Sequence, residues 1–473
     1  MAGAQIATTS GGSETLDDAA IGTLSSALQG KIIQQDDAAY DETRAIWNAM
    51  IDKRPGLIVQ CASTSDIIAA VKFARERDLL VTVRGAGHNI AGKSISDGGL
   101  MIDLSQMKGV RVDAAAKRAF VEPGATLGDL DAATAADGLV TPTGINSTTG
   151  IAGLVLGGGF GWLSRKLGMT IDNLVSADVV TADGSELHAS EDENSDLFWA
   201  LRGGGANFGI VTQFEFNLHA VGPDLLSGLI VLPQSQAKQA LKKYSAFTKT
   251  MPEELNIWSV MRKAPPLPFL PEDVHGTDVI IFALCWAGDP EEGEKAIAPI
   301  SEWGDPVGEH VGVQPFAAWQ QAFDPLLTEG FRNYWKSHNF TEISDGLIDV
   351  LVESAGNVPT GHCEVFIACL GGATSRVAPD AMAYSHRDAN YVMNVHGRWE
   401  TPAEDATVIA WARGAFDGAA PFATGGVYVN FMPEDEEDRV GAAYGVNQAR
   451  LAELKRKYDP TNFFSQNQNI KPA

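Results

Sequence analysis

The feature that most constrains this fold is a glycine-rich loop around one histidine, VRGAGHNIAGKS at residues 83–94. Two short runs of large apolar residues, 57–60 and 79–83, predict buried strands on either side of a helix. This strand–helix–strand unit leads directly into the loop. The glycines let the backbone approach a bulky anionic group, and His88 is the reactive side chain among them. The loop is therefore either a cofactor cradle or a tight turn that contains a histidine.

The composition favours a large enzyme of two or three domains. The chain has 473 residues, of which 49 are glycine and 45% are hydrophobic. A net charge of −25 argues against nucleic acid or an anionic membrane as a partner. The N-terminus lacks the basic and apolar regions of a signal peptide, and no apolar run predicts a membrane span. We therefore expect a cytoplasmic protein, a monomer or homodimer, that acts on a small molecule.

Several other chemistries lack their sequence signatures. None of the glycine-rich segments fits the GxGxxG dinucleotide fingerprint, since Ile90 stands where the third glycine would follow Gly85 and Gly87. The four cysteines show no CxxC spacing, and we expect them to be buried free thiols. HExxH, GxSxG and Walker motifs are absent, so we expect neither a metal site nor a hydrolase.

The sequence changes in character near residue 218. Before this point, short strands alternate with glycine-rich segments, and Asp183-Gly184 predicts a hairpin turn. After it, apolar runs alternate with helical patterns and predict one larger sheet. We therefore expect a flexible tail at 1–29, a first domain at 30–217, a second domain at 218–414 and a separate C-terminal segment at 415–473.

His88 has a chemical role open to it if the loop holds a flavin. An imidazole nitrogen can bond to the methyl carbon of an isoalloxazine ring, which fixes the flavin and raises its reduction potential. The alternative is an ordinary hydrogen-bonded loop histidine.

Five stretches, taken together and in order, carry a family resemblance. They are RPGLIVQCASTSDIIAAVKFA, VRGAGHN, GGGFGWLSRKLGMTIDNLVSADVVTADG, DLFWALRGGGANFGIVT and YDPTNFFSQNQNI. With them the chain resembles, from about residue 30 to 472, the FAD-linked oxidases of the vanillyl-alcohol-oxidase/PCMH superfamily, specifically the berberine-bridge-enzyme-like group. The resemblance implies an α+β, two-domain PCMH-type FAD-binding fold, with an antiparallel-sheet substrate domain backed by helices and a C-terminal segment that returns to the FAD domain.

The resemblance also implies FAD as the cofactor, joined through its 8α-methyl group to His88. It places the pyrophosphate cradle in the loop, a second glycine-rich segment along the flavin, and further contacts on one strand and near the C-terminus. The implied cofactor contacts are Arg84, Gly85, Ala86, Gly87, Asn89, Ser94, Gly124, Gly144, Ser147, Thr148, Gly150, Gly153, Ile210, Val211, Tyr428, Asn430 and Asn467.

Three positions depart from patterns found in parts of this family. Asn146 stands where doubly linked members carry a second, cysteine tether, so we expect one covalent bond only, and an open sugar site is less favoured. Thr149 falls where the family places a residue thought to gate oxygen access, and its size favours an oxidase. Phe160 replaces a tyrosine that acts as base in plant members, so we expect it to contact substrate or flavin.

The identity of the catalytic base stays open at this point. Tyr444 is the leading candidate, but a free phenol needs a cationic neighbour to act at neutral pH, which Lys336, Arg387 or His386 could supply. Glu364 lies in an apolar strand, where burial would raise its pKa toward that of a base. His386 and Tyr391 are further candidates for substrate contact.

The expected reaction is a two-electron oxidation. A hydride leaves a C–H next to a hydroxyl or amine of a small aromatic, heterocyclic or natural-product substrate, and O₂ is reduced to H₂O₂. The alternatives are a dehydrogenase with another electron acceptor and a flavin- or ligand-binding protein without turnover.

Overall fold

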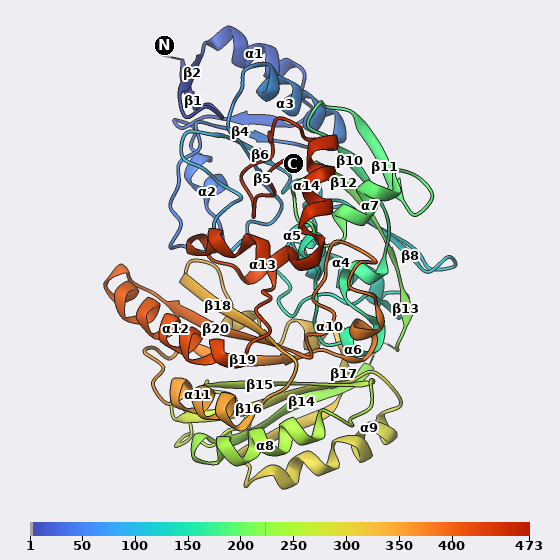
Figure 1. Ribbon diagram of the computed structural model, residues 1–473, viewed down its shortest axis with the longest axis vertical. Helices are drawn as coiled ribbons and strands as arrows, with labels where there is room; N and C mark the ends of the chain where they lie inside the picture. Colours follow the sequence, from blue (N-terminus) through green and yellow to red (C-terminus); the bar gives the residue numbers. More distant parts are fainter. Residues whose placement is uncertain (1–2, 223) are drawn as a thin grey trace.

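The structure, a computed structural model, describes residues 3–222 and 224–473 and has an α+β fold of two parts (Figure 1). One part contains a four-stranded sheet, a five-stranded sheet and the small sheet of β1 (Ala4–Ala7) and β2 (Ser13–Leu16), all from the first 217 residues, together with the C-terminal helices α13 (Val440–Tyr444) and α14 (Gln448–Tyr458). The other is a single seven-stranded sheet backed by helices.

The first sheet presents the glycine–histidine loop. Its four strands have the order β3-β4-β6-β5, and β4 and β5 both pair in parallel with β6. The predicted strand–helix–strand unit is confirmed, and the helix α3 begins after an N-cap at Ser63. Because β5 ends at Arg84, the loop leaves the carboxyl end of a buried strand. The bounds are β3 (Lys31–Ile33), β4 (Leu57–Gln60), α3 (Thr64–Glu76), β5 (Val81–Arg84) and β6 (Leu100–Asp103).

The second sheet is five-stranded and antiparallel, in the order β11-β10-β12-β8-β7. The predicted hairpin is confirmed, since β10 pairs with β11 across a turn in which Gly184 has a φ of +76°. Its strands are β7 (Val110–Asp113), β8 (Arg118–Val121), β10 (Leu174–Val180), β11 (Glu186–Ser190) and β12 (Ile210–Asn217). The helices of this part are α1 (Asp18–Ser26), α2 (Tyr40–Arg44), α4 (Leu127–Ala135), α5 (Ile151–Gly157), α6 (Ser164–Leu167) and α7 (Ser195–Leu201).

The large sheet has the antiparallel order β17-β14-β16-β15-β19-β20-β18. One face packs on helices, which lie below it in Figure 1, and the other faces the first part. Successive side chains therefore enter different environments: on β20, Val392 joins the core of the first part and Met393 the helix-covered core. The elements are β14 (Asp224–Pro233), α8 (Ala237–Phe247), β15 (Leu255–Lys263), β16 (Asp278–Trp286), α9 (Pro290–Ile297), β17 (Gly308–Pro315), α10 (Phe316–Gln320), β18 (Arg332–Phe340), α11 (Asp345–Ala355), β19 (Glu364–Cys369), β20 (Tyr391–Trp399) and α12 (Asp405–Ala419).

Two expectations about the ends of the domains are wrong. The segment 1–29 is no tail within its described residues, because β1 (Ala4–Ala7), β2 (Ser13–Leu16) and α1 bury apolar side chains such as Ile6 and Leu24. The boundary after 414 falls inside α12, which packs on β18 and β20 and so extends the substrate layer to residue 419.

Two further expectations concern membranes and metals. No helix in the described ranges is both long and apolar enough to cross a bilayer. Across the same residues, no three His, Cys, Asp or Glu side chains converge in a way that could bind a metal ion.

Candidate active site

A cavity of about 370 Å³ lies between the two parts of the molecule. Its walls come from the glycine–histidine loop, the segment 144–162, the C-terminal stretches 428–431 and 466–468, and the inner face of the large sheet. Residues far apart in the sequence thus meet in one space.

The loop side of the cavity has the shape of a cradle. Gly87 has a φ of +75°, and a Cβ at Gly150 would lie 2.9 Å from the Cβ of Ala86, so only glycine permits this close approach. Ser94 Oγ and Asn467 Oδ1 are buried there and have no hydrogen-bond partner among the described residues. Two backbone segments that approach each other closely, together with unpaired polar atoms, fit a large cofactor that carries many oxygen and nitrogen atoms, such as FAD.

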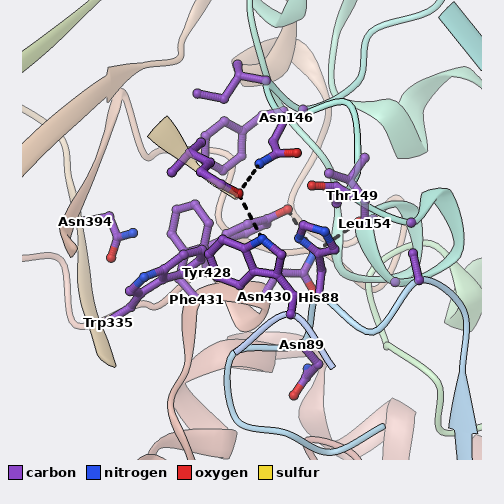
Figure 2. A pocket seen from close by; sticks show the side chains of 18 of the residues that line it. His88, Asn89, Asn146, Thr149, Leu154, Trp335, Asn394, Tyr428, Asn430 and Phe431 are labelled. Carbon is purple, nitrogen blue, oxygen red and sulfur yellow. Dashed lines mark hydrogen bonds between the residues drawn. The ribbon is translucent and has the colours of Figure 1, made fainter. Parts of the chain in front are cut away.

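His88 lies in the wall of this cavity beside Asn146 and Thr149 (Figure 2). The Trp47 indole stacks on its ring, with centroids 5.0 Å apart and planes 21° apart. The Nε2 atom of His88 is 2.9 Å from the Thr148 hydroxyl. Burial lowers the pKa of His88 to about 3, so the ring is neutral at physiological pH and keeps a free lone pair.

A row of polar side chains crosses the sheet face opposite the cradle. Arg262, Glu364 and His396 are register partners on the adjacent strands β15, β19 and β20, and Trp335 on β18 completes the row. Arg262 Nη1 is 2.6 Å from Glu364 Oε2, and His396 Nδ1 is 3.4 Å from Glu364 Oε1.

This network fixes the charge of each member. Burial acts to raise the pKa of Glu364, but the Arg262 guanidinium and the His396 ring outweigh it and lower the pKa to about 2. The raised pKa expected for Glu364 is therefore wrong, because its strand brings it a buried cation. Burial lowers the pKa of His396, while Glu364 opposes that shift, so the imidazole is neutral beside an ionised carboxylate.

The remaining walls are apolar and largely aromatic. Phe160 packs against Tyr428 and Phe431 with ring centroids 4.8 and 5.9 Å apart, and Phe431 meets Trp335 edge-on at 5.5 Å (Figure 2). Trp258 stacks on Phe366 at 5.6 Å. These ring faces and edges give the cavity an apolar, aromatic wall of the kind that ligand pockets commonly have.

Most of the predicted cofactor contacts line this cavity. They are Gly85, Ala86, Gly87, His88, Asn89, Ser94, Gly144, Gly150, Gly153, Ile210, Val211, Tyr428, Asn430 and Asn467.

Four of the predicted contacts do not line the cavity. The Arg84 guanidinium bonds the Thr43 carbonyl and faces Asp103, so its charge does not enter the cavity. Ser147 bonds Asp324, and a Cβ at Gly124 would collide with the Leu104 carbonyl 1.9 Å away. Thr148 lies behind His88, which it contacts.

Tyr444 lines the cavity but is not polarised by a cation. Its hydroxyl donates to the Gln468 carbonyl at 2.8 Å, and burial raises its pKa well above the ordinary value. The expected helpers are engaged elsewhere: Lys336 with Glu436 at 2.8 Å, Arg387 with Asp172 at 2.7 Å, and His386 with the Ala443 carbonyl at 2.9 Å.

Three predicted residues do not reach the cavity. Lys336 follows Trp335 on β18 and therefore points to the opposite face of the sheet. Tyr391 belongs to the helix-covered core, where its hydroxyl lies 2.6 Å from that of Thr248. His386 is held by the backbone carbonyl of Ala443 outside the cavity wall.

Sequence reasoning missed Trp47, Arg262, Trp335 and His396. The only signal for His396 was the alternation in YVMNVHGRW, which places Asn394 and His396 on one face of a strand. Nothing local in the sequence marks Trp47 or Arg262, because tertiary packing alone brings them to the site.

A glycine-lined cradle with unpaired polar atoms, which faces a buried charged row on the sheet, fits a flavin-dependent oxidoreductase. Comparisons with known proteins agree with this class. The family models for the FAD binding domain and for berberine and berberine-like proteins match residues 55–190 and 427–471. The chain is 32% identical to an FAD-linked oxidoreductase of Dictyostelium discoideum, over 94% of this chain and 95% of that protein.

Two further comparisons involve 6-hydroxynicotine oxidases. The chain is 30% identical to (R)-6-hydroxynicotine oxidase of Paenarthrobacter nicotinovorans, with 94% of this chain and 97% of the relative covered. The fold matches the crystal structure of 6-hydroxy-D-nicotine oxidase from Arthrobacter nicotinovorans with a TM-score of 0.83 and 27% identity, over 94% of this chain and 98% of the other. The chain belongs to the berberine-bridge-enzyme-like group of FAD-linked oxidoreductases.

Proposed function

We propose that this enzyme is an oxidase that removes a hydride from a C–H next to a hydroxyl or amine of a small aromatic, heterocyclic or natural-product substrate. It holds FAD by one covalent bond through His88. Bound FAD supplies the hydride acceptor and passes the electrons to O₂, giving H₂O₂. The observation that carries this proposal is that one cavity is lined both by the glycine–histidine cradle and by the polar row of the sheet.

The apolar walls support an aromatic substrate. Trp258, Phe366 and Phe431 offer ring faces and edges, and Val260 and Ile281 extend the apolar surface. The sheet brings Arg262, Glu364 and His396 to the cavity in one row and Asn394 beside them, which suits a substrate with a polar group at one end. An oligosaccharide would place many of its hydroxyl groups against these apolar walls, and each hydroxyl without a hydrogen-bond partner would weaken binding.

The polar row supplies the proton acceptor. His396 is neutral, with Nδ1 facing the Glu364 carboxylate and Nε2 3.3 Å from Asn333 Oδ1. Nε2 takes the hydroxyl or amine proton as the hydride leaves, and the Glu364 carboxylate and the Asn333 oxygen stabilise the imidazolium that forms. Arg262 keeps Glu364 ionised and in place. Of the candidates for base, Glu364 thus acts through His396, and Tyr444 and Lys336 play no part in the proton transfer.

An anaerobic screen tests this function. Purified enzyme is mixed with secondary benzylic alcohols, arylalkylamines, N-heterocyclic amines and xylo- or chito-oligosaccharides, and flavin absorbance is followed. We expect an aromatic alcohol or amine to bleach the flavin, and admission of air to restore the colour with one H₂O₂ per turnover. Bleaching by oligosaccharides alone contradicts the substrate class, and bleaching by nothing in the panel favours a binding protein.

Oxygen reactivity separates the oxidase from a dehydrogenase. Thr149 lines the cavity beside His88 and is small enough to leave O₂ access to the flavin. Stopped-flow mixing of reduced enzyme with O₂ should give reoxidation faster than steady-state turnover. If O₂ reoxidises the reduced flavin more slowly than the enzyme turns over with an artificial electron acceptor, the enzyme is not an oxidase.

A further inference from the structure

A chain of hydrogen bonds behind His88 determines which nitrogen of its ring carries a proton. The Oδ1 atom of Asn146 is 2.9 Å from the backbone nitrogen of Thr148 and 2.7 Å from its hydroxyl oxygen. A backbone N–H can only donate, so the Asn146 atom that faces it is the carbonyl oxygen and not the amide nitrogen. The Thr148 hydroxyl must then donate its hydrogen to the same oxygen.

This leaves only one arrangement for His88. The Thr148 hydroxyl has a single hydrogen, which Asn146 receives, so at the 2.9 Å contact the hydroxyl oxygen can only accept. His88 Nε2 must therefore carry the ring proton and donate it. In a neutral imidazole the other nitrogen, Nδ1, then holds the lone pair. Within the described residues, the hydrogen bond of this ring involves Nε2 alone.

The same cluster holds the ring in place. The Leu327 carbonyl accepts hydrogen bonds from Trp47 Nε1 at 3.0 Å and from Asn146 Nδ2 at 3.4 Å. Trp47 in turn stacks on His88. The contacts close a loop from His88 through Thr148, Asn146, Leu327 and Trp47 back to His88. The tautomer and the plane of the ring are thus set before any cofactor bond exists.

Building on the covalent link of the proposed function, we propose that Thr148 and Asn146 are positioning residues that present Nδ1 of His88 to the flavin. The bond forms between Nδ1 and the carbon of the 8-methyl group. That carbon would lose one hydrogen as a proton, Nε2 of the substituted ring would release the proton it carried, and the C–H bonding pair would pass to the flavin. O₂ takes up these electrons with two protons as H₂O₂, and the flavin returns to its oxidised state.

Asn146 has a different role in this chain from the residue that other family members carry at its position. It occupies the position where the family resemblance places a second tether in doubly linked members. Here the residue cannot bond to flavin, and its amide instead orders the residues around the one tether. Its amide oxygen accepts two hydrogen bonds and its amide nitrogen donates one, so replacement by an apolar residue breaks the chain at its anchor.

The test compares Thr148→Val, which removes the hydroxyl at constant size, with Thr148→Ser, which retains it. The matched control is Thr134→Val, because Thr134 is buried in α4 and its hydroxyl bonds only carbonyls of that helix. Each protein is produced under riboflavin limitation and incubated with FAD, and acid-stable flavin is measured over time. The flavinylated peptide is then examined by NMR: a methylene on Nδ1 lies near the histidine β-protons, and one on Nε2 lies near Hδ2.

We expect the wild type, Thr148→Ser and Thr134→Val to tether FAD at the same rate through Nδ1. Thr148→Val should tether it at least about 5-fold more slowly, the effect of one lost hydrogen bond, and give a mixture of linkages. If Thr148→Val fails to fold, Asn146→Leu serves as the second variant, with the same expected result.

Two contrary results are distinguishable. Tethering by Thr148→Val at the wild-type rate and through Nδ1 alone overturns the role of Thr148 and leaves the covalent link standing. Wild-type protein without acid-stable flavin removes the covalent link itself, and this inference with it.

Discussion

Replacing Glu364 by glutamine should show how much the charge of Glu364 contributes to the free energy of unfolding. The substitution keeps the size of the side chain and removes the charge that contacts Arg262 and His396. Glutamine still offers an oxygen to Arg262, but the guanidinium is left buried without a counter-charge. The loss should therefore appear in stability before any substrate is added.

The magnitude follows from the pKa of Glu364. Its fall from 4.5 to about 2 corresponds to about 3 kcal/mol of folding free energy, at about 1.4 kcal/mol for each pH unit. Because the folded-state pKa is the lower one, this stabilisation is fully present above pH 4.5 and is lost as the pH falls toward 2. Leaving one partner of a buried pair alone typically costs a similar 3–5 kcal/mol.

Urea unfolding at pH 7, 5, 4 and 3 tests this reasoning, with Glu353→Gln as a control on the exposed side of α11. We expect Glu364→Gln to be about 3 kcal/mol less stable than wild type at pH 7, with a difference that shrinks steadily below pH 4.5. The control should match wild type throughout. A difference that stays constant with pH, or that is absent at pH 7, would refute the pairing.

Three further predictions concern catalysis and the tether. His396→Asn should slow anaerobic flavin reduction by the best substrate of the screen about 100-fold. It should also abolish the fall in rate at acid pH, because the wild-type ring must be neutral to accept a proton and its pKa lies below 6.5. An unchanged rate would exclude His396 as the base. Tyr444→Phe should leave that rate at the wild-type value, and a 100-fold loss would restore Tyr444 as the base. Trp47→Leu should slow formation of acid-stable flavin about 5-fold through the lost stacking, as judged by the colour of the acid-precipitated protein over time, and equal rates would show that the indole does not hold the ring.

The cofactor side of the site could be predicted from the sequence because its signals are local. Glycines at fixed positions around His88 reflect backbone constraints that neighbouring residues alone create, as the close approach of Gly150 to Ala86 illustrates. Asn146 could be singled out only through the family resemblance, which places a second tether at its position.

The substrate side could not be predicted, because alternation along a strand does not say which face meets the cavity. Trp335 and Lys336 are adjacent, yet one lines the cavity and the other pairs with Glu436. The Arg262–Glu364–His396 row depends on the register of three strands whose residues lie up to 134 positions apart, from 262 to 396. No local pattern in the sequence records that register.

The prediction of a flexible N-terminal tail was wrong for a related reason. Its small polar residues suggest a tail, yet Ile6 and Leu16 complete the apolar core beside α3. A few apolar side chains in a polar context become significant only when a partner surface exists for them.

The most direct test of the whole account is acid precipitation of the purified enzyme, followed by mass spectrometry of its peptides. The account predicts a yellow pellet and a single peptide, the one that contains His88, with the added mass of one FAD. A colourless pellet with all flavin in the supernatant, or an FAD attached to any other residue, would contradict it.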